Sequence, residues 1–211
     1  MSFFDNARHS KFVKSMEKQE NTSRFIGYYL DRLSIAAEPT LGDRTATLIA
    51  RSPASPTARA LLTALTECES LAVRVEVLFA KAEPADQMAQ WLEFSARNDA
   101  ADPFLLLRKA ENPALIDAHE QMVLGATFSW QGDCMRRDPE TRDAFETFEC
   151  FNSEAAKRAS RTFQALWPKG EKLSATRRLA QQLDPTELPA GVLNLTPSTP
   201  GSAGPSASTR H

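Results

Sequence analysis

The stretch Ala118–Phe151, AHEQMVLGATFSWQGDCMRRDPETRDAFETFECF, decides the fold, because it alternates short apolar segments with polar turns. Ala118–Leu124 has the apolar content of a strand, and Gly125 after it permits a hairpin into a second strand. The phenylalanines of residues 145–151 indicate a last strand, with an extended helix as the alternative. The stretch therefore predicts a strand hairpin followed by one more element.

The chain before this stretch has the pattern of a parallel sheet. Thr45–Arg51 alternates like a strand, and Val73–Ala80 is β-branched and apolar enough for an interior strand. Between them, Thr57–Ser70 is predicted to be a helix, with Ser55 as its candidate N-cap and Pro56 at its first position. A strand, a helix and a strand in so few residues form a crossover that makes the two strands parallel.

Three further segments complete the element order. Asp86–Arg97 is predicted to be a helix, and Phe104–Arg108 a short buried strand. Ser153–Trp167 is predicted to be a helix capped by Ser153. The predicted fold is therefore α/β, with a mixed, partly parallel sheet flanked by helices and preceded by an N-terminal helical arm.

The chain divides into four predicted segments. Residues 1–38 form an amphipathic helical arm, broken at 21–23 into two helices, which either packs on the domain or mediates dimerisation. Residues 39–168 form the α/β domain, and residues 169–183 form a basic surface helix. Residues 184–211 are rich in Pro, Ser, Thr, Gly and Ala, so we expect a disordered tail.

The composition limits the environment and the partners. Lys and Arg number 25 against 27 Asp and Glu, and a formal net charge of -2 provides no overall attraction for nucleic acid. Nucleic-acid binding would need a local basic patch. No apolar run approaches the roughly 20 residues that span a bilayer, and the start lacks the pattern of a signal peptide. With three cysteines, this favours a cytoplasmic protein without a membrane span, and no pattern indicates a cofactor.

With this element order, residues 45–167 resemble one half of the phospholipase D-like superfamily. The resemblance rests on three pieces, PTARALLTALTECESLAVRVEVLFA, AHEQMVLG and GDCMRRDPETRDAFETFECFNSEAAKRASRTFQALW. In that family one strand carries His-x-Lys, a following strand carries Gly-Ser-x-Asn, and a later strand carries a glutamate before a helix ending in Leu-Trp-like residues. The family needs two such halves, so the resemblance implies a homodimer and a phosphate-containing ligand.

The resemblance assigns the family's site to particular positions of this chain. His119 falls at the nucleophilic histidine, and Gln121 replaces the lysine two residues on. Asp133 stands at the serine and Met135 at the asparagine. The candidate catalytic remnants are His119 and Glu146, and the candidate binding residues are Gln121, Gly132, Asp133, Arg136 and Arg137.

These departures weaken the chemistry. In such a site the histidine attacks phosphorus and the lysine stabilises the charge that builds on the phosphoryl oxygens. Gln121 offers a dipole without a charge, and at ~4 Å with a dielectric of about 20 the loss is about 4 kcal/mol, roughly three decades in rate. Asp133 would repel the anion where a serine hydroxyl would donate to it. We therefore interpret the chain as a degenerate, non-catalytic half.

Several residues keep two interpretations. His119 is either a hydrogen-bonded histidine at the edge of the core or a remnant that pairs with Glu146 or Asp133 in a ligand pocket. A metal site of His119, Asp133 and Cys134 has no recognised ligand spacing, so no metal is predicted. Arg136 and Arg137, with Arg142 nearby, form either an anion-binding cluster or a salt-bridged loop.

The function expected from the sequence is a pseudoenzyme-like interaction or ligand-binding module. The first alternative is a weak phosphodiesterase or nuclease that uses His119 in a homodimer. The second is a structural adaptor that recruits partners through its arm and tail.

Overall fold

The structure is a computed structural model that describes residues 8–13, 15–68, 73–97, 104–136 and 144–173. The predicted tail of residues 184–211 lies outside the described residues, and so do Arg137 and Arg142. Among the described residues, no helix has both the length and the apolar character needed to cross a membrane.

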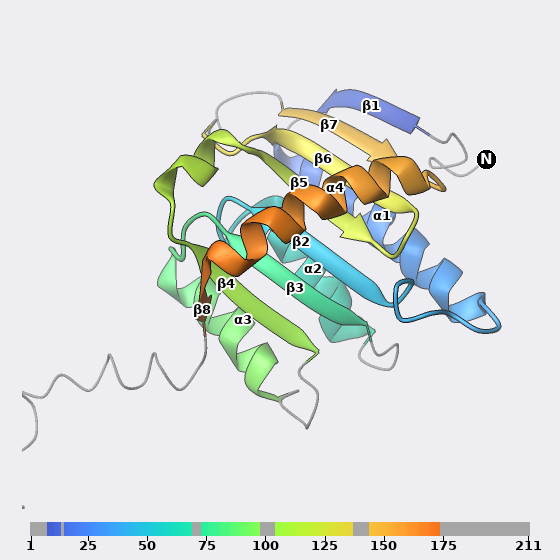
Figure 1. Cartoon of the computed structure of the whole chain (residues 1–211), viewed down its shortest axis with the longest axis horizontal. Helices are drawn as coiled ribbons and strands as arrows, with labels where there is room; N and C mark the ends of the chain where they lie inside the picture. The colour runs from blue at the N-terminus through green and yellow to red at the C-terminus, as the bar shows by residue number, and fades with distance from the viewer. Residues whose placement is uncertain (1–7, 14, 69–72, 98–103, 137–143, 174–211) are drawn as a thin grey trace, which may run out of the picture.

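An eight-stranded sheet forms the centre of the molecule, with the strand order β1-β7-β6-β5-β2-β3-β4-β8 (Figure 1). The pairs β2–β3 and β3–β4 are parallel, and the remaining pairs are antiparallel, which confirms the predicted mixed sheet. The strands are β1 (Arg8–Val13), β2 (Thr45–Ala50), β3 (Arg74–Phe79), β4 (Leu105–Ala110), β5 (His119–Leu124), β6 (Phe128–Cys134), β7 (Ala144–Glu149) and β8 (Gly170–Leu173).

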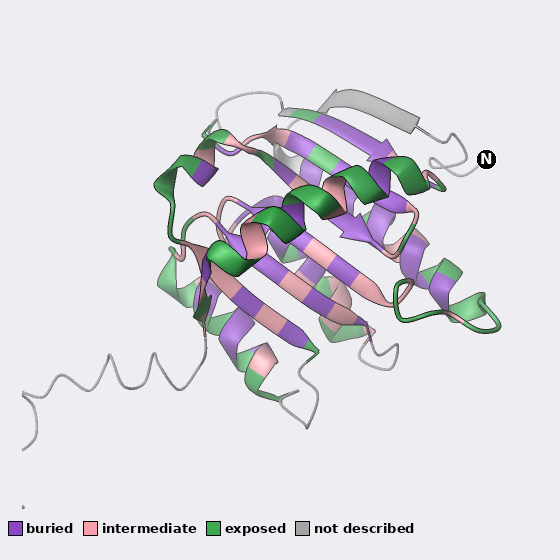
Figure 2. Cartoon of the chain, viewed as in Figure 1, coloured by how far each residue is buried: buried purple, intermediate pink, exposed green. Residues whose placement is uncertain are grey.

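Helices cover the sheet unequally. One face packs against α1, α2 and α3, and the other is crossed by α4 (Figure 1). The helices are α1 (Ser15–Ile35), α2 (Pro56–Glu67), α3 (Ala85–Arg97) and α4 (Ser153–Leu166), with short 3-10 turns η2 (Pro113–Asp117) and η3 (Trp167–Lys169). Figure 2 shows α4 with a largely exposed outer side, whereas the strands behind it alternate between buried and half-buried positions.

Two hydrophobic cores reflect this asymmetry. The larger lies between the sheet and α1, α2 and α3, where Phe25, Phe79 and Trp91 are fully buried. The smaller lies under α4, where Phe163 packs with Ile49 and Leu78. Alternate residues of one strand enter different cores, because successive strand side chains point to opposite faces.

The N-terminal segment differs from the predicted arm in two respects. Residues 8–13 form strand β1, which pairs with β7, instead of a helix. Helix α1 is continuous through Asn21 and Thr22, both of which are buried. The Thr22 hydroxyl donates to the carbonyl of Lys18 at 2.8 Å, and the Asn21 amide donates to Glu146 at 3.4 Å, so neither side chain caps a helix end.

The helix starts also differ in detail from prediction. Ser55 precedes α2, but its hydroxyl accepts from the backbone N–H of Ser52 at 3.2 Å and makes no capping bond to the helix. Asn152, and not Ser153, caps α4, because its side-chain oxygen accepts from the backbone N–H of Ala155 at 3.1 Å.

The C-terminal end of the described chain adds a strand where a surface helix was predicted. Gly170–Leu173 forms β8 and pairs antiparallel with β4. Arg108 of β4 donates to the carbonyl of Trp167 at 2.8 Å and stacks over its ring at 4.7 Å. These contacts join the end of α4 to the sheet, and the rest of the predicted helix, residues 174–183, lies outside the described residues.

Candidate functional site

Five polar side chains of β5, β6 and β7 share the α4 face of the sheet. Gln121 lies opposite Gln131 on the neighbouring strand, and Gln131 lies opposite Thr147 on the next. Ser129 lies opposite Glu149 in the same ladder, two residues from Gln131. Because directly paired residues point to one face, these side chains form one polar surface.

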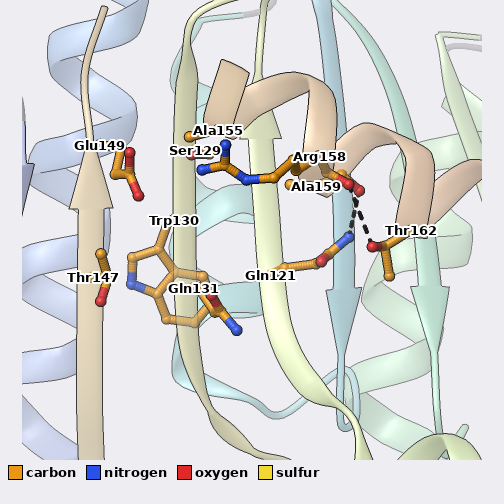
Figure 3. A pocket seen from close by; sticks show the side chains of 10 residues that line it. All are labelled: Gln121, Ser129, Trp130, Gln131, Thr147, Glu149, Ala155, Arg158, Ala159 and Thr162. Carbon is orange, nitrogen blue, oxygen red and sulfur yellow. Dashed lines mark hydrogen bonds between the residues drawn. The ribbon is translucent and has the colours of Figure 1, made fainter. Parts of the chain in front are cut away.

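Helix α4 covers this surface and leaves a cavity of about 190 Å³, which we call the α4 pocket (Figure 3). The floor is formed by the strand residues Gln121, Ser129, Trp130, Gln131, Thr147 and Glu149. The roof is formed by Ala155, Arg158, Ala159 and Thr162. The two alanines are spaced four residues apart, so small side chains face the sheet and leave the space open.

One hydrogen bond joins the floor of the α4 pocket to its roof, and others lie within the roof and beside the floor. Gln121 Nε2 donates to the carbonyl of Ala159 at 2.9 Å, and the Thr162 hydroxyl donates to the carbonyl of Arg158 at 3.3 Å (Figure 3). Glu149 accepts a hydrogen bond from Asn152 Nδ2 at 2.5 Å. Gln121 therefore connects β5 to α4.

His119 lies at the exposed start of β5 and is not among the residues that line the α4 pocket. Its Nδ1 is 3.0 Å from the carbonyl of Gly132. A carbonyl oxygen can only accept, so Nδ1 carries the proton and Nε2 is the basic nitrogen. A bulge between His119 and Gln121 shifts the strand register here.

Gly132 is close to Trp130 and leaves no room for a side chain. A Cβ at Gly132 would lie 2.5 Å from Cη2 of the Trp130 ring, which is fully buried. Asp133 turns toward its own chain and accepts from the backbone N–H of Cys134 at 2.8 Å. Met135, predicted at the asparagine position, is buried in the smaller core. The structure thus brings His119 and Gly132 together, whereas Asp133 bonds to its own backbone and Met135 is buried in the smaller core.

Arg136 lies at an exposed position after β6. Its Nη2 donates to Asp117 at 2.8 Å, and the two side chains form an exposed ion pair. Arg137 and Arg142, the other members of the predicted anion-binding cluster, are outside the described residues. Arg136 is thus paired with a carboxylate of η2, outside its own loop.

Glu146 lies on the opposite face from the α4 pocket and has no exposed surface. It accepts from Trp130 Nε1 at 3.3 Å and from Asn21 Nδ2 at 3.4 Å. Next to it, Lys18 and Glu120 form a buried ion pair at 2.6 Å, and Lys18 also lies 5.3 Å from the centre of the Trp130 ring. We call these five residues the α1 cluster, and in it Glu146 is separated from Gln121 by the sheet.

Cysteines and metal ligands add little to the site. Burial raises the pKa of the Cys150 thiol to about 11, so that thiol is protonated at neutral pH. Cys134 directs its sulfur to the carbonyl of Asp117 at 3.3 Å. Within the part of the chain that the structure describes, no group of three His, Cys, Asp or Glu residues is arranged to hold a metal ion.

The mixed sheet, the crossover helices and the long helix after β7 define a phospholipase D-like α/β fold. The solved structure of Nuc from Salmonella typhimurium, a phospholipase D family member, matches with a TM-score of 0.53 and 13% identity, over 80% of this chain and 99% of that chain. TrmBL2, an archaeal chromatin protein with a novel mode of DNA binding, matches with a TM-score of 0.55 and 12% identity, over 82% of this chain and 57% of its own.

NucT from Helicobacter pylori matches with a TM-score of 0.47 and 9% identity, over 79% of this chain and 99% of that chain. No protein-family model matches the chain, and no curated protein matches it in sequence. At these identities the likeness concerns the fold alone.

Sequence reasoning missed most of the α4 pocket. The residues it did not single out are Ser129, Gln131, Thr147, Glu149 and Arg158. A signal was present, because β6 reads Ser-Trp-Gln and β7 reads Thr-Phe-Glu, with polar residues on either side of one buried aromatic. Ser129 and Gln131 lie on the same face of the sheet as Gln121.

Proposed function

We propose that this chain is a non-catalytic phospholipase D-like domain that acts as a ligand-binding or interaction module. The proposal depends on the hydrogen bond that Gln121 donates to the Ala159 carbonyl. The resemblance aligns Gln121 with the family's lysine, and its amide is uncharged and already bonded. Phosphoryl transfer depends on fixed cations facing the phosphate oxygens. The α4 pocket has one arginine and one carboxylate, Arg158 and Glu149, so it offers an anion no net positive charge.

A phosphodiesterase assay tests this proposal. Bis-(p-nitrophenyl) phosphate is incubated with the full chain and with His119→Ala, and release of nitrophenolate is measured. We expect equal rates for the two proteins, because the residue two positions from His119 is the uncharged Gln121, whose amide is bonded to Ala159. A wild-type rate that His119→Ala abolishes would refute the non-catalytic proposal.

A second candidate function is a weak phosphodiesterase that works as a homodimer. It is supported by the state of His119, whose Nδ1–H is held by Gly132 while Nε2 has no partner among the described residues. A nucleophilic imidazole needs one nitrogen held and the other available. A site built from two halves needs two copies of this chain. Light scattering at micromolar concentration measures the molar mass, and a mass of one chain would rule out the homodimeric phosphodiesterase.

A further inference from the structure

A second cavity, of about 270 Å³, lies at the C-terminal end of α4, beside the turn η2, and we call it the η2 cavity. The described residues that line it are all different from those of the α4 pocket. Six of these nine residues are apolar, namely Leu78, Ala110, Ala114, Leu115, Ala118 and Leu166. Resting on the proposed function as a ligand-binding module, we propose that the η2 cavity binds a small uncharged amphiphile of the aliphatic alcohol class.

The inner part of the η2 cavity belongs to the smaller hydrophobic core. Leu78 and Leu115 are almost fully buried members of that core, and Leu166 packs against it. The three alanines of the lining contribute only methyl groups, so space remains between the leucines. A hydrocarbon chain that enters this space removes its own apolar surface and that of the leucines from water, which is favourable.

The wall formed by η2 is held by hydrogen bonds at both of its ends. At its start, Asn112 Oδ1 accepts from the backbone N–H of Ala114 at 2.9 Å. At its end, the backbone N–H of Ala118 donates to the carbonyl of Leu115 at 2.9 Å. The Ala118 carbonyl also accepts from the backbone N–H of Met135 at 2.9 Å, which ties this end of η2 to the end of β6.

A second wall, at the end of α4, is fixed by the sheet. Leu166 is followed by Trp167, whose carbonyl accepts from Arg108 Nη1 at 2.8 Å, and the same nitrogen donates to the Gly170 carbonyl at 3.2 Å. A Cβ at Gly170 would lie 2.9 Å from Cδ1 of Leu78, so the backbone of β8 packs closely against this leucine. Because both walls are held without a ligand, binding requires little ordering of the protein.

The exposed residues of the lining determine which polar group suits the mouth of the η2 cavity. Glu111 and Lys169 are exposed lining residues of opposite charge. A ligand with a charged end would meet one like charge there, whatever its sign. A hydroxyl group both donates and accepts hydrogen bonds, so it is compatible with a carboxylate and with an ammonium group. The mouth therefore favours an uncharged polar end.

The volume of the η2 cavity sets the size of the hydrocarbon part. An apolar protein cavity of roughly 150 Å³ accommodates benzene, which has six carbon atoms. At about 270 Å³, the η2 cavity is larger than that and just below the roughly 300 Å³ at which pockets for drug-sized molecules begin. We therefore expect it to accept a chain of about six carbon atoms or slightly more.

The test is a methyl NMR titration of the full-length chain with butan-1-ol, pentan-1-ol and hexan-1-ol. The methyl resonances of Leu78, Leu115 and Leu166 should shift, because these side chains line the η2 cavity. The dissociation constant should fall about fourfold for each added methylene, since burial of one methylene contributes about 0.8 kcal/mol. Hexanoate and hexylamine should each bind about threefold or more weakly than hexan-1-ol, because each meets a like charge at the mouth.

Ala118→Leu should weaken hexan-1-ol binding about tenfold or more, because the larger side chain occupies the space between the leucines. Ala165→Leu is the matched control, since Ala165 is an exposed alanine of α4 and is not among the described lining residues. It should leave binding unchanged, and the melting temperature of each unliganded variant checks its folding. The alcohol series on the unmodified chain tests the proposal even where a variant fails to fold.

Three outcomes would overturn the amphiphile proposal: affinity that does not rise along the alcohol series, tighter binding of hexanoate or hexylamine than of hexan-1-ol, and shifts confined to methyl groups outside the η2 cavity. Hydrolysis of the phosphodiester substrate by the same preparation would instead refute the proposed non-catalytic function. The two proposals therefore fail by different measurements.

Discussion

The two faces of β5, β6 and β7 use adjacent residues for opposite purposes. Glu120 points to the α1 cluster and is paired with Lys18, whereas Gln121 points to the α4 pocket. Glu146 is sealed under α1, whereas Thr147 lines the pocket. On one face the charges of Lys18 and Glu120 are buried and paired, whereas on the other Arg158 is exposed at the rim of a cavity. Charge on the closed face is therefore enclosed by packing, whereas charge on the open face lines a cavity.

The helix that covers each face accounts for the difference. Helix α1 brings Lys18, Asn21 and Phe25 into the sheet, so long side chains fill the space. Helix α4 brings Ala155 and Ala159 over the polar floor, so a cavity remains. The same three paired strands thus have a filled face under α1 and a face with a cavity under α4.

The largest effect is expected from breaking the ion pair of the closed face. Lys18→Ala should lower the free energy of unfolding by about 3 kcal/mol or more, because Glu120 would remain charged and buried. Urea denaturation measures this loss. The control is Arg24→Ala, which removes an exposed pair with Glu20 and should cost less than about 1 kcal/mol.

A double variant sharpens this prediction. Lys18→Met with Glu120→Gln removes both charges and keeps an acceptor for the backbone N–H of Arg51, which lies 3.1 Å from Glu120. It should recover most of the lost stability, because a buried pair is often replaceable by neutral groups. Equal losses from Lys18→Ala and Arg24→Ala would contradict the buried ion pair.

The elements with strong apolar periodicity were predictable from sequence. The β2, α2 and β3 segments combine buried stripes with proline punctuation, and the structure confirms them. Strand β8 has the sequence GEKL, which carries no such pattern, and it forms because β4 offers an edge and Arg108 fixes Trp167. The polar side chains of Asn21 and Thr22 suggested a break in α1, but in the folded chain they bond to Glu146 and to their own helix.

The site was harder to predict than the fold, because its membership depends on strand register. A shift of one residue moves every side chain to the other face of a sheet. A bulge lies between His119 and Gln121, and beyond it Gln131 lies opposite Gln121 on β6. Arg158 could not be predicted from the sequence either, because only the packing of α4 on the sheet places it at the α4 pocket.

A smaller effect is expected at Gly132, which lies beside the Trp130 ring of the closed face. Gly132→Ala should destabilise by about 1–3 kcal/mol, because its Cβ would overlap a ring that is held by Glu146 and cannot move aside. Gly27→Ala is the control, since no atom lies within 4 Å of the added Cβ and the site is helical. It should stabilise by roughly 0.5–1 kcal/mol. Thermal unfolding of both variants with the same sign would contradict this packing.

The smallest effect is expected at Asn152, which connects the open face to the start of α4. Asn152→Ala removes the cap on Ala155 and should cost about 1 kcal/mol by urea denaturation. The control is Ser153→Ala, at the position expected from sequence to be the cap, which should cost no more than a few tenths of a kcal/mol because Ser153 is already helical. Asn152 also donates to Glu149, and Ser153→Ala leaves that contact in place. A larger stability loss from Ser153→Ala than from Asn152→Ala would show that α4 is capped where the sequence suggested.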